Sequence, residues 1–387
     1  MEPQRKKLKT VHNVVDIHDW STKCFENPVI SENIFRHLRA DDKAVAARVC
    51  KQWHDIIYKP RMWRHNDLFI DMDAVDMRIM APSLKRRNIT KLKLHSYADS
   101  VAERKHVVKQ LLYLMRSLGH IIRSLDMEMF CVILDERILV RAFNYKTLSF
   151  LETLILSVDF GNQSQLIKVI CERCPYLKRL EMPYFDRMTD SSLTLIGQNL
   201  TELRELDLGF SSITNTGINL LAQLPLRKLS LCSCNQINED CIIPLLQFRN
   251  SLKCLDISCC FNLDSNVALY RIAKSGLCLT ELRIGYYVIP WFDEGGVPDA
   301  VNDVAIEFFL WKKAGRRLKR FLIEDLKFSA LTGASIVENC PELRVLSMER
   351  QNVTDRAKEA FERLKTAPWN GYQQQPHRET RQRSYSL

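Results

Sequence analysis

LKRLEM at residues 177–182, LRELDL at 203–208, LRKLSL at 226–231 and LKCLDI at 252–257 are four copies of one pattern. Apolar side chains stand at its first, fourth and sixth positions, and the copies follow one another at intervals of 26, 23 and 26 residues. Six further copies begin at Ile89, Ile122, Leu151, Leu279, Leu318 and Leu343, which makes ten. A recurring period of this length predicts an array of stacked repeats.

Each copy predicts a strand followed by a turn and a helix. The fourth and sixth positions are two residues apart, so a strand directs both side chains toward a core between neighbouring units. Helix starts are indicated by polar capping pairs ahead of apolar residues such as Leu193, Ile196, Ile218 and Leu221. The pairs are Thr189-Asp190, Thr214-Asn215, Asp264-Ser265 and Thr354-Asp355. One unit cannot bury its own apolar face, so the array is expected to fold by stacking into an α/β horseshoe solenoid, with a parallel concave sheet and helices on the convex side.

A separate helical unit is expected before the repeats, in ENPVISENIFRHLRADDKAVAARVCKQWHDIIYKPRMW (26–63). Helical spacing of apolar residues predicts one helix through Ile30, Ile34 and Leu38, and a second through Val45, Val49, Trp53 and Ile57. Asp41 and Asp42 are candidate caps of the second helix, Pro60 ends it, and a third short piece begins at Met62 and Trp63. Three helices in about 45 residues provide little core, so part of this apolar surface should face another protein. Complete enclosure of Phe35 and Trp53 within the chain would argue against such a docking face.

This stretch resembles an F-box, over residues 24 to 66. Its Pro28, Ile34-Phe35, Leu38, Val49-Cys50, Trp53 and Met62-Trp63 match the family's pattern, although Asn27 stands where leucine usually precedes the proline. The repeats look like leucine-rich repeats, and the cysteines of LCSC (231–234) and SCC (258–260) are similar to the cysteine-containing subtype that commonly follows an F-box. Cys232, Cys234, Cys259 and Cys260 are then expected to act as small apolar fillers.

The combination resembles the substrate receptors of SCF-type (Skp–cullin–F-box) ubiquitin ligases. The resemblance implies that the F-box binds a Skp-type adaptor, which connects it to the cullin and RING subunits, while the repeats bind a protein substrate for ubiquitination. The expected adaptor-binding residues are Pro28, Ile34, Phe35, Leu38, Val49, Cys50 and Trp53, and Trp63 is expected to pack the F-box against the first repeats. The alternative is a non-degradative repeat scaffold that binds the adaptor without cullin. No hydrolase, metalloprotease, P-loop or dinucleotide motif occurs, so a non-catalytic protein without cofactor or metal is expected.

Two regions of the repeats are candidate substrate-binding surfaces. Residues alternating with the core leucines should point outward from the strands, and they place Glu181, Glu205, Asp207, Asp256 and Glu281 on one face. Such a face is expected to prefer a basic segment of the substrate; the alternative is a solvated charged face without a ligand. The second region is a loop near 285–303, which carries Tyr286, Tyr287, Trp291 and Phe292. It is expected to serve recognition, or alternatively to pack back on the array.

Composition limits the remaining possibilities. The chain has 387 residues, a formal net charge of +10 and 13 cysteines. An odd cysteine count without a secretory signal or a membrane-spanning apolar run predicts reduced thiols in the cytoplasm, the nucleus or both. Cys171 and Cys174 form a CxxC pair that lacks a second ligand pair, so they are expected to be structural rather than metal-binding.

Much of the positive charge lies at the two ends of the chain. The expected organisation is a basic disordered tail (1–22), the F-box (23–68), the repeats (69–365) and a second basic disordered tail (366–387). PQRKKLK, near the N-terminus, is either a nuclear-import signal or a solvated tail. Nucleic acid is not an expected partner, because no aromatic platform interleaved with basic residues is evident in the repeats.

Overall fold

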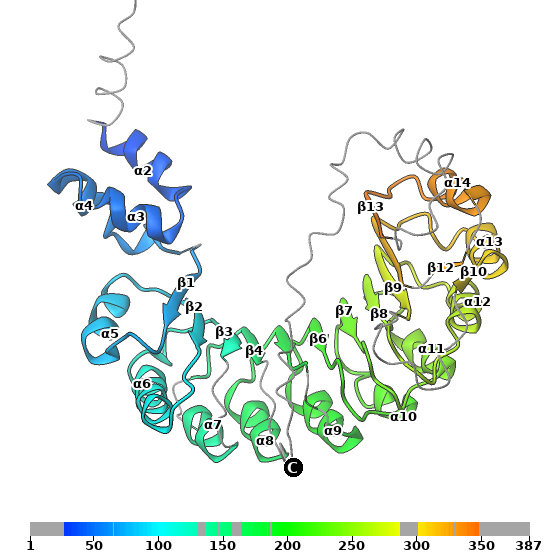
Figure 1. The fold of residues 1–387 in the computed structure, drawn as a ribbon, viewed down its shortest axis with the longest axis horizontal. Coiled ribbons are helices and arrows are strands. Elements are labelled where there is room, and N and C mark those ends of the chain that lie inside the picture. Colours follow the sequence, from blue (N-terminus) through cyan, green and yellow to red (C-terminus); the bar gives the residue numbers. More distant parts are fainter. Residues whose placement is uncertain are drawn as a thin grey trace, which may run out of the picture.

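A computed structural model describes residues 27–64, 66–130, 136–144, 148–156, 164–183, 185, 188–286, 301–324, 326–327 and 330–347. Strands line the inner side of a horseshoe and helices cover its outer side, with a small group of helices at the N-terminal end (Figure 1). One continuous hydrophobic core runs from this N-terminal group through the repeats. No helix of the described chain is long and apolar enough to cross a membrane.

The inner layer is an 11-stranded parallel sheet in which the strands follow one another in sequence order, apart from a small pair of strands outside it. The strands are β1 (Leu68–Asp71), β2 (Lys91–Ser96), β3 (Ser124–Phe130), β4 (Thr153–Leu156), β5 (Arg179–Glu181), β6 (Glu205–Asp207), β7 (Lys228–Ser230), β8 (Cys254–Asp256), β9 (Glu281–Gly285), β11 (Arg320–Glu324) and β13 (Val345–Ser347). β10 (Val301–Asn302) and β12 (Leu326–Lys327) form the separate parallel pair.

All ten predicted copies of the pattern lie on strands of this sheet, which confirms the predicted fold. The fourth-position residues are in register across neighbouring strands, as in Leu180, Leu206, Leu229 and Leu255, and all four are buried. The additional strand is β1, which precedes the first predicted copy and pairs with β2 through Leu68 and Leu92. Its four residues contain only the end of the repeat pattern, so the period alone did not indicate it.

The outer layer consists of one helical segment per repeat. It comprises α5 (Met77–Arg86), α6 (Val101–Leu118), α7 (Glu136–Phe143), α8 (Ser164–Arg173), α9 (Asp190–Asn199), α10 (Asn215–Asn219), η3 (Glu239–Cys241), α11 (Ile242–Leu245), η4 (Leu246–Phe248), α12 (Ser265–Ser275), α13 (Asp303–Trp311) and α14 (Ala330–Asn339). The predicted apolar positions Leu193, Ile196, Ile218 and Leu221 are all fully buried.

Three of the predicted helix starts are confirmed, and the fourth, Thr354-Asp355, lies outside the described residues. Asp264 caps α12 by accepting hydrogen bonds from the N–H groups of Asn266 and Val267. Thr189 and Thr214 occupy the cap positions of α9 and α10 without a side-chain capping bond. Thr214 instead bonds the Asp190 carboxylate of the preceding repeat, from its N–H at 2.9 Å and its hydroxyl at 2.6 Å. These polar residues therefore connect repeats as well as start helices.

The N-terminal helical domain contains α2 (Pro28–Arg36), α3 (Ala40–Ala46), α4 (Lys51–Ile57) and the single turn η1 (Pro60–Met62). The predicted second helix is wrong, because it is divided into α3 and α4. Cys50 separates them with an extended backbone (φ −156°, ψ 166°), and its Sγ accepts from the Trp53 N–H at 3.5 Å. The second correction concerns Asp41 and Asp42, which lie in the first turn of α3, whereas Arg39 occupies its cap position.

Trp63 connects this domain to the first repeat, as predicted. The side chain is buried, and its Nε1 donates to the Ile57 carbonyl at 2.7 Å. The guanidinium carbon of Arg87, which follows α5, lies 4.9 Å from the centre of the Trp63 ring and 4.1 Å from that of Tyr58. The domain and the array therefore share apolar and cation–π contacts.

Candidate docking and recognition surfaces

The N-terminal helical domain has a small core of its own. Phe35 on α2 meets Trp53 on α4 edge to face, with ring centres 4.8 Å apart at an angle of 62°. Ile56, Ile57 and Met62 complete the core and are at most 3% exposed. Helices α2 to α4 are thus held together through the side chains that face inward.

Several large apolar side chains of the same domain point outward. Val29 is 67% exposed, Val45 66% and Val49 62%, and Ile30 and Ile34 are each 39% exposed. Ile30 and Ile34 are four residues apart on α2, so they lie on the same side of that helix. All five fall within residues 29–49, and single exposed apolar residues are common but clusters usually mark interaction sites. We call these five residues the exposed apolar face of the domain.

The predicted adaptor-binding residues divide between this surface and the core. Pro28, Ile34, Val49 and Cys50 are exposed. Leu38 and Trp53 are half-buried and pack against the core. Phe35 is only 1% exposed, so the prediction that it contributes to an accessible surface is corrected.

Enclosure of both Phe35 and Trp53 would have argued against a docking face. Phe35 is enclosed, but Trp53 is only half-buried, so that condition is not met. The sequence analysis did not predict that Val29, Ile30 and Val45 are exposed. Their exposure depends on which side of each helix faces the core, and the structure places Ser31, Phe35 and Ala46 on that side instead.

The predicted carboxylates on the repeats do share the inner face. Neighbouring strands are in register, which places Glu181, Asp207 and Asp256 in one row with Ser230 and Arg283. Glu205 and Glu281 lie in the adjacent row, together with Arg179, Lys228, Cys254 and Arg320. Across strands β5 to β11 the two rows therefore hold five carboxylates and four cations.

These charges form a ladder of ion pairs. Arg179 lies 2.7 Å from Glu181 and 3.5 Å from Glu205, and Lys228 lies 3.7 Å from Glu181. Arg283 approaches Asp256 at 3.6 Å and Arg320 approaches Glu281 at 3.5 Å. Neighbouring cations thus offset most of the expected acidic field, and the preference for a basic substrate segment remains a prediction.

Asp207 and Asp256 differ from the other carboxylates of the two rows because their pKa values are raised. Burial raises the pKa of Asp207, although it accepts hydrogen bonds from the Gly209 N–H at 3.0 Å and from Ser230. Burial likewise raises the pKa of Asp256 in spite of the nearby Arg283 guanidinium. These two groups support the turns that follow β6 and β8, since Asp256 also accepts from the Ser258 N–H and hydroxyl.

The cysteine prediction holds for two of its four residues. Cys234 and Cys260 are buried, and their thiols donate to the carbonyls of Leu208 and Leu231, one repeat back, at 3.2 and 3.1 Å. They therefore fill space and also satisfy a backbone oxygen of the preceding repeat. Cys232 and Cys259 are only half-buried, so their role as core fillers is corrected.

The CxxC pair lies in the helical layer. Cys171 and Cys174 are both buried, and burial raises the pKa of each thiol to about 12. Within the part of the chain that the structure describes, no group of three or more histidine, cysteine or carboxylate residues could hold a metal ion.

Of the four aromatic residues predicted in the loop near 285–303, Tyr286 is described, and Tyr287, Trp291 and Phe292 lie outside the described residues. The Tyr286 ring lies 4.7 Å from that of Phe261, which follows β8 and is 45% exposed. Tyr286 therefore extends an aromatic contact along the edge where β8 and β9 end.

An aromatic cluster on β1 and β2 was not predicted. The His95 ring lies 5.2 Å from Phe69 and 4.0 Å from Tyr97, and the last two are 59% and 58% exposed. Lys93 is on the same strand and is paired with Asp126 at 3.4 Å. Basic and aromatic residues therefore lie close together at this end of the sheet, and the expectation that nucleic acid is not a partner remains a prediction.

The architecture is that of a small helical domain followed by a leucine-rich-repeat horseshoe. A family model described as F-box-like matches residues 28–68. Among curated proteins, the putative F-box/LRR-repeat protein 23 of Arabidopsis thaliana is 26% identical over 201 residues, which cover 50% of this chain and 43% of that protein. The chain therefore spans less than half the length of the curated relative it matches. Together the two matches support an F-box/leucine-rich-repeat family for this chain.

Two solved structures have a low overall similarity to this chain. An internalin from Listeria monocytogenes is 17% identical with a TM-score of 0.41, covering 74% of this chain and 81% of the internalin chain. A chain of the Rad7 and Elc1 complex of yeast is 16% identical with a TM-score of 0.48, covering 88% of this chain and 87% of that chain.

Proposed function

We propose that this protein is the substrate-recognition subunit of an SCF-type ubiquitin ligase. The F-box-like domain binds a Skp-type adaptor, which recruits cullin and RING subunits, and the inner face of the repeats binds a protein substrate. The role requires no catalytic group in this chain. Holding a substrate lysine close to a ubiquitin-charged enzyme raises its effective concentration, and a rigid repeat array is suited to that task.

The observation that carries the proposal is the exposed apolar face of the F-box-like domain. Five large β-branched side chains face solvent within residues 29–49, beside a core that holds the three helices in place. Burying apolar area is the main favourable term in association, at about 25 cal/mol per Å². A preformed face also loses little conformational entropy on binding.

Replacing two residues of this face tests the proposal. In the double variant Ile34→Glu and Val49→Glu, two carboxylates would have to lose their hydration when the adaptor binds, so affinity should fall at least about 100-fold. The measurement is binding of purified Skp-type adaptor by calorimetry, with circular dichroism to establish that the variant is folded.

Ile79→Glu is the matched control, because Ile79 on α5 is 79% exposed and lies outside the domain. It should bind adaptor like the unmodified protein. A folded double variant with undiminished adaptor affinity would refute the assigned surface. Capture of the adaptor followed by detection of cullin then separates the ligase subunit from a scaffold: adaptor without cullin would exclude the ligase role.

A further inference from the structure

Helix α13 carries large apolar residues on its solvent side as well as on its core side. Its inner side buries Ala305, Ile306, Phe309 and Leu310 against the core, as every repeat requires. On its outer side Val304 is 66% exposed and Trp311 is 69% exposed. The solvent side of α13 thus combines two large exposed apolar residues with the exposed carboxylate of Glu307.

Helices α8 and α9 of the outer layer show a simpler pattern, with polar residues toward solvent. The exposed residues of α8 include Gln165, Lys168 and Glu172, and those of α9 include Ser191 and Gln198. An outer helix of a solenoid needs no apolar residue on its solvent side, since its neighbours contact it laterally. The outer side of α13 is therefore not explained by stacking of the repeats.

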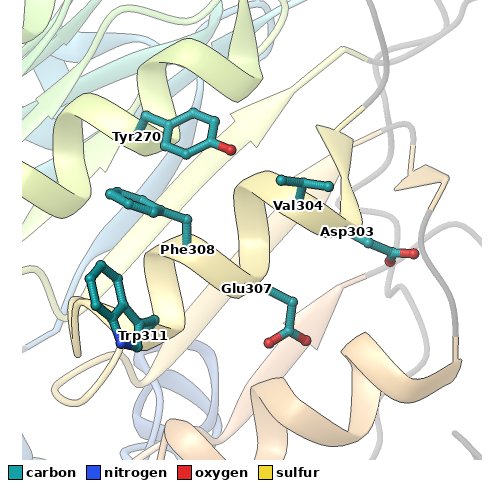
Figure 2. Close-up of a pocket in the computed structure, with 6 residues that line it drawn as sticks. All are labelled: Tyr270, Asp303, Val304, Glu307, Phe308 and Trp311. Carbon is teal, nitrogen blue, oxygen red and sulfur yellow. The ribbon is translucent and has the colours of Figure 1, made fainter.

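A groove lies along this side of α13, next to α12. It is shallow and open to solvent, has a volume of about 500 Å³, and is lined by Tyr270 from α12 and by Asp303, Val304, Glu307, Phe308 and Trp311 from α13 (Figure 2). The Phe308 ring lies 4.6 Å from Tyr270 and 5.7 Å from Trp311, so three aromatic rings form a continuous wall. Aromatic residues in such an arrangement are typical of interface anchors.

The groove is electrically polarised along the helix. Asp303 and Glu307, one turn apart, lie at its N-terminal half, away from the rings (Figure 2). At the opposite end the Lys312 ammonium lies 4.3 Å from the Trp311 ring centre, and Lys274 and Lys312 each lie 5.7 Å from that of Phe308. A second cation would be repelled at the aromatic end and attracted at the carboxylate end.

We propose that this groove binds a short protein segment that carries a bulky apolar residue close to a basic residue. The apolar residue covers Phe308 and Trp311, and the basic residue faces Asp303 and Glu307. Complementary charge fixes the direction of the segment, and apolar burial supplies most of the affinity. The groove lies on the convex side, at the opposite end of the horseshoe from the F-box-like domain, so it is independent of the proposed adaptor contact (Figure 1).

Fluorine NMR of protein labelled with 5-fluorotryptophan tests the site directly, because the chain has six tryptophans and Trp311→Phe identifies the relevant signal. The probe is the pentapeptide acetyl-Gly-Leu-Ala-Arg-Gly-amide at millimolar concentration. It should shift the Trp311 signal saturably. Peptides with Glu in place of Arg, or Ala in place of Leu, should bind at least about fivefold more weakly.

Charge reversal in the protein provides the matched comparison. Glu307→Lys should weaken binding of the Arg peptide by at least about fivefold, whereas Glu172→Lys, an equivalent change on α8, should leave it unaltered. Equal binding of the Arg and Glu peptides, or no shift of Trp311, would overturn the proposal. So would a Trp311 signal that moves with protein concentration alone, because the occupant would then be a second copy of the chain.

Discussion

Lys43 on α3 has no exposed side-chain surface, which is unusual for an ammonium group. Its Nζ donates to the Met62 carbonyl at 2.6 Å, to the Asn66 side-chain oxygen, and to the Arg36 carbonyl at 3.5 Å. Loss of hydration on burial lowers the pKa of this lysine. One side chain thus joins the end of α2 to η1 and the segment that leads to the first repeat.

Replacing this ammonium group should destabilise the F-box-like domain. Lys43→Met keeps the volume but leaves the Met62 carbonyl and the Asn66 side chain short of a donor, so unfolding free energy should fall by about 1–3 kcal/mol. Urea denaturation measures the change, and Lys51→Met, at an exposed position on α4, is the control. An increase in stability would mean that the desolvation cost of the ammonium exceeds the value of its hydrogen bonds.

The buried thiols predict how stability depends on pH. Burial raises the pKa of Cys174 and of Cys241 to about 12. In the unfolded chain a thiol titrates near its ordinary value of about 8.5, so above that pH the unfolded state loses protons that the folded state keeps. The stabilisation from each thiol is therefore fully present below about pH 8.5 and is lost as pH rises toward 12, at about 1.4 kcal/mol per pH unit.

Comparison of variants isolates this effect from other alkaline titrations. The double variant Cys174→Ala and Cys241→Ala is compared with the unmodified protein in the presence of reductant. Between about pH 9 and about pH 10.5, the unfolding free energy of the variant should fall less steeply, by about 1.4 kcal/mol per pH unit for each thiol removed. Cys278→Ala should leave the slope unchanged because Cys278 is exposed. If unfolding free energy falls with pH at the same slope in all three proteins, the raised pKa of the two buried thiols is contradicted.

The close approach of α9 and α10 depends in part on the glycine at position 197. A Cβ added to Gly197 would overlap the carbonyl oxygen of Leu220, which follows α10. That oxygen belongs to the backbone, so it cannot move aside as a flexible side chain could. The absence of a side chain at Gly197 therefore sets how closely these two repeats stack.

Gly197→Ala should force the two repeats apart and reduce the unfolding free energy by about 1–3 kcal/mol, despite the better helix propensity of alanine. Chemical denaturation measures this change in the unfolding free energy of the repeat array. Gln198→Ala, at the exposed neighbouring position, is expected to be nearly neutral. A stabilised Gly197→Ala protein would show that helix propensity outweighs the overlap.

How far the elements could be predicted depended on whether their signal was periodic. The ten strands followed from a repeated apolar pattern that every copy reinforces. The N-terminal helices lack such repetition, and the four-residue spacing of Val45, Val49, Trp53 and Ile57 arose by coincidence across the break between α3 and α4 at Cys50. Strand β1 was missed because it carries too little of the pattern to be separated from the preceding helices.

The candidate sites were predictable in position more than in chemistry. Alternation along a strand placed Glu181 and Asp256 on the inner face, yet their neutralisation by Arg179 and Arg283 depends on side chains of the same and adjacent strands. Exposure of Val29 or Trp311 follows from tertiary packing, which one helical period does not determine. The sequence therefore placed the predicted carboxylates on one face, and the structure was needed to separate exposed apolar residues from the core.

At the scale of the whole molecule, the orientation of the F-box-like domain relative to the array determines where a bound substrate would lie. Arg87 is well placed to fix that orientation, since it belongs to the first repeat and lies over Tyr58 and Trp63 of the domain. Each such contact contributes about 0.5–2 kcal/mol, more when shielded from water. Loss of the Arg87 guanidinium should therefore make local opening of this junction more frequent.

Arg87→Ala should raise amide hydrogen exchange in residues 57–64 and 84–89, with little change in the central repeats, because the loss affects a local opening rather than global unfolding. Arg87→Lys should restore part of the protection, as a lysine retains the charge without the planar group. Arg86→Ala, at the exposed neighbouring residue, is the control. Unchanged exchange in Arg87→Ala would show that apolar packing around Trp63 holds the junction without help from the cation.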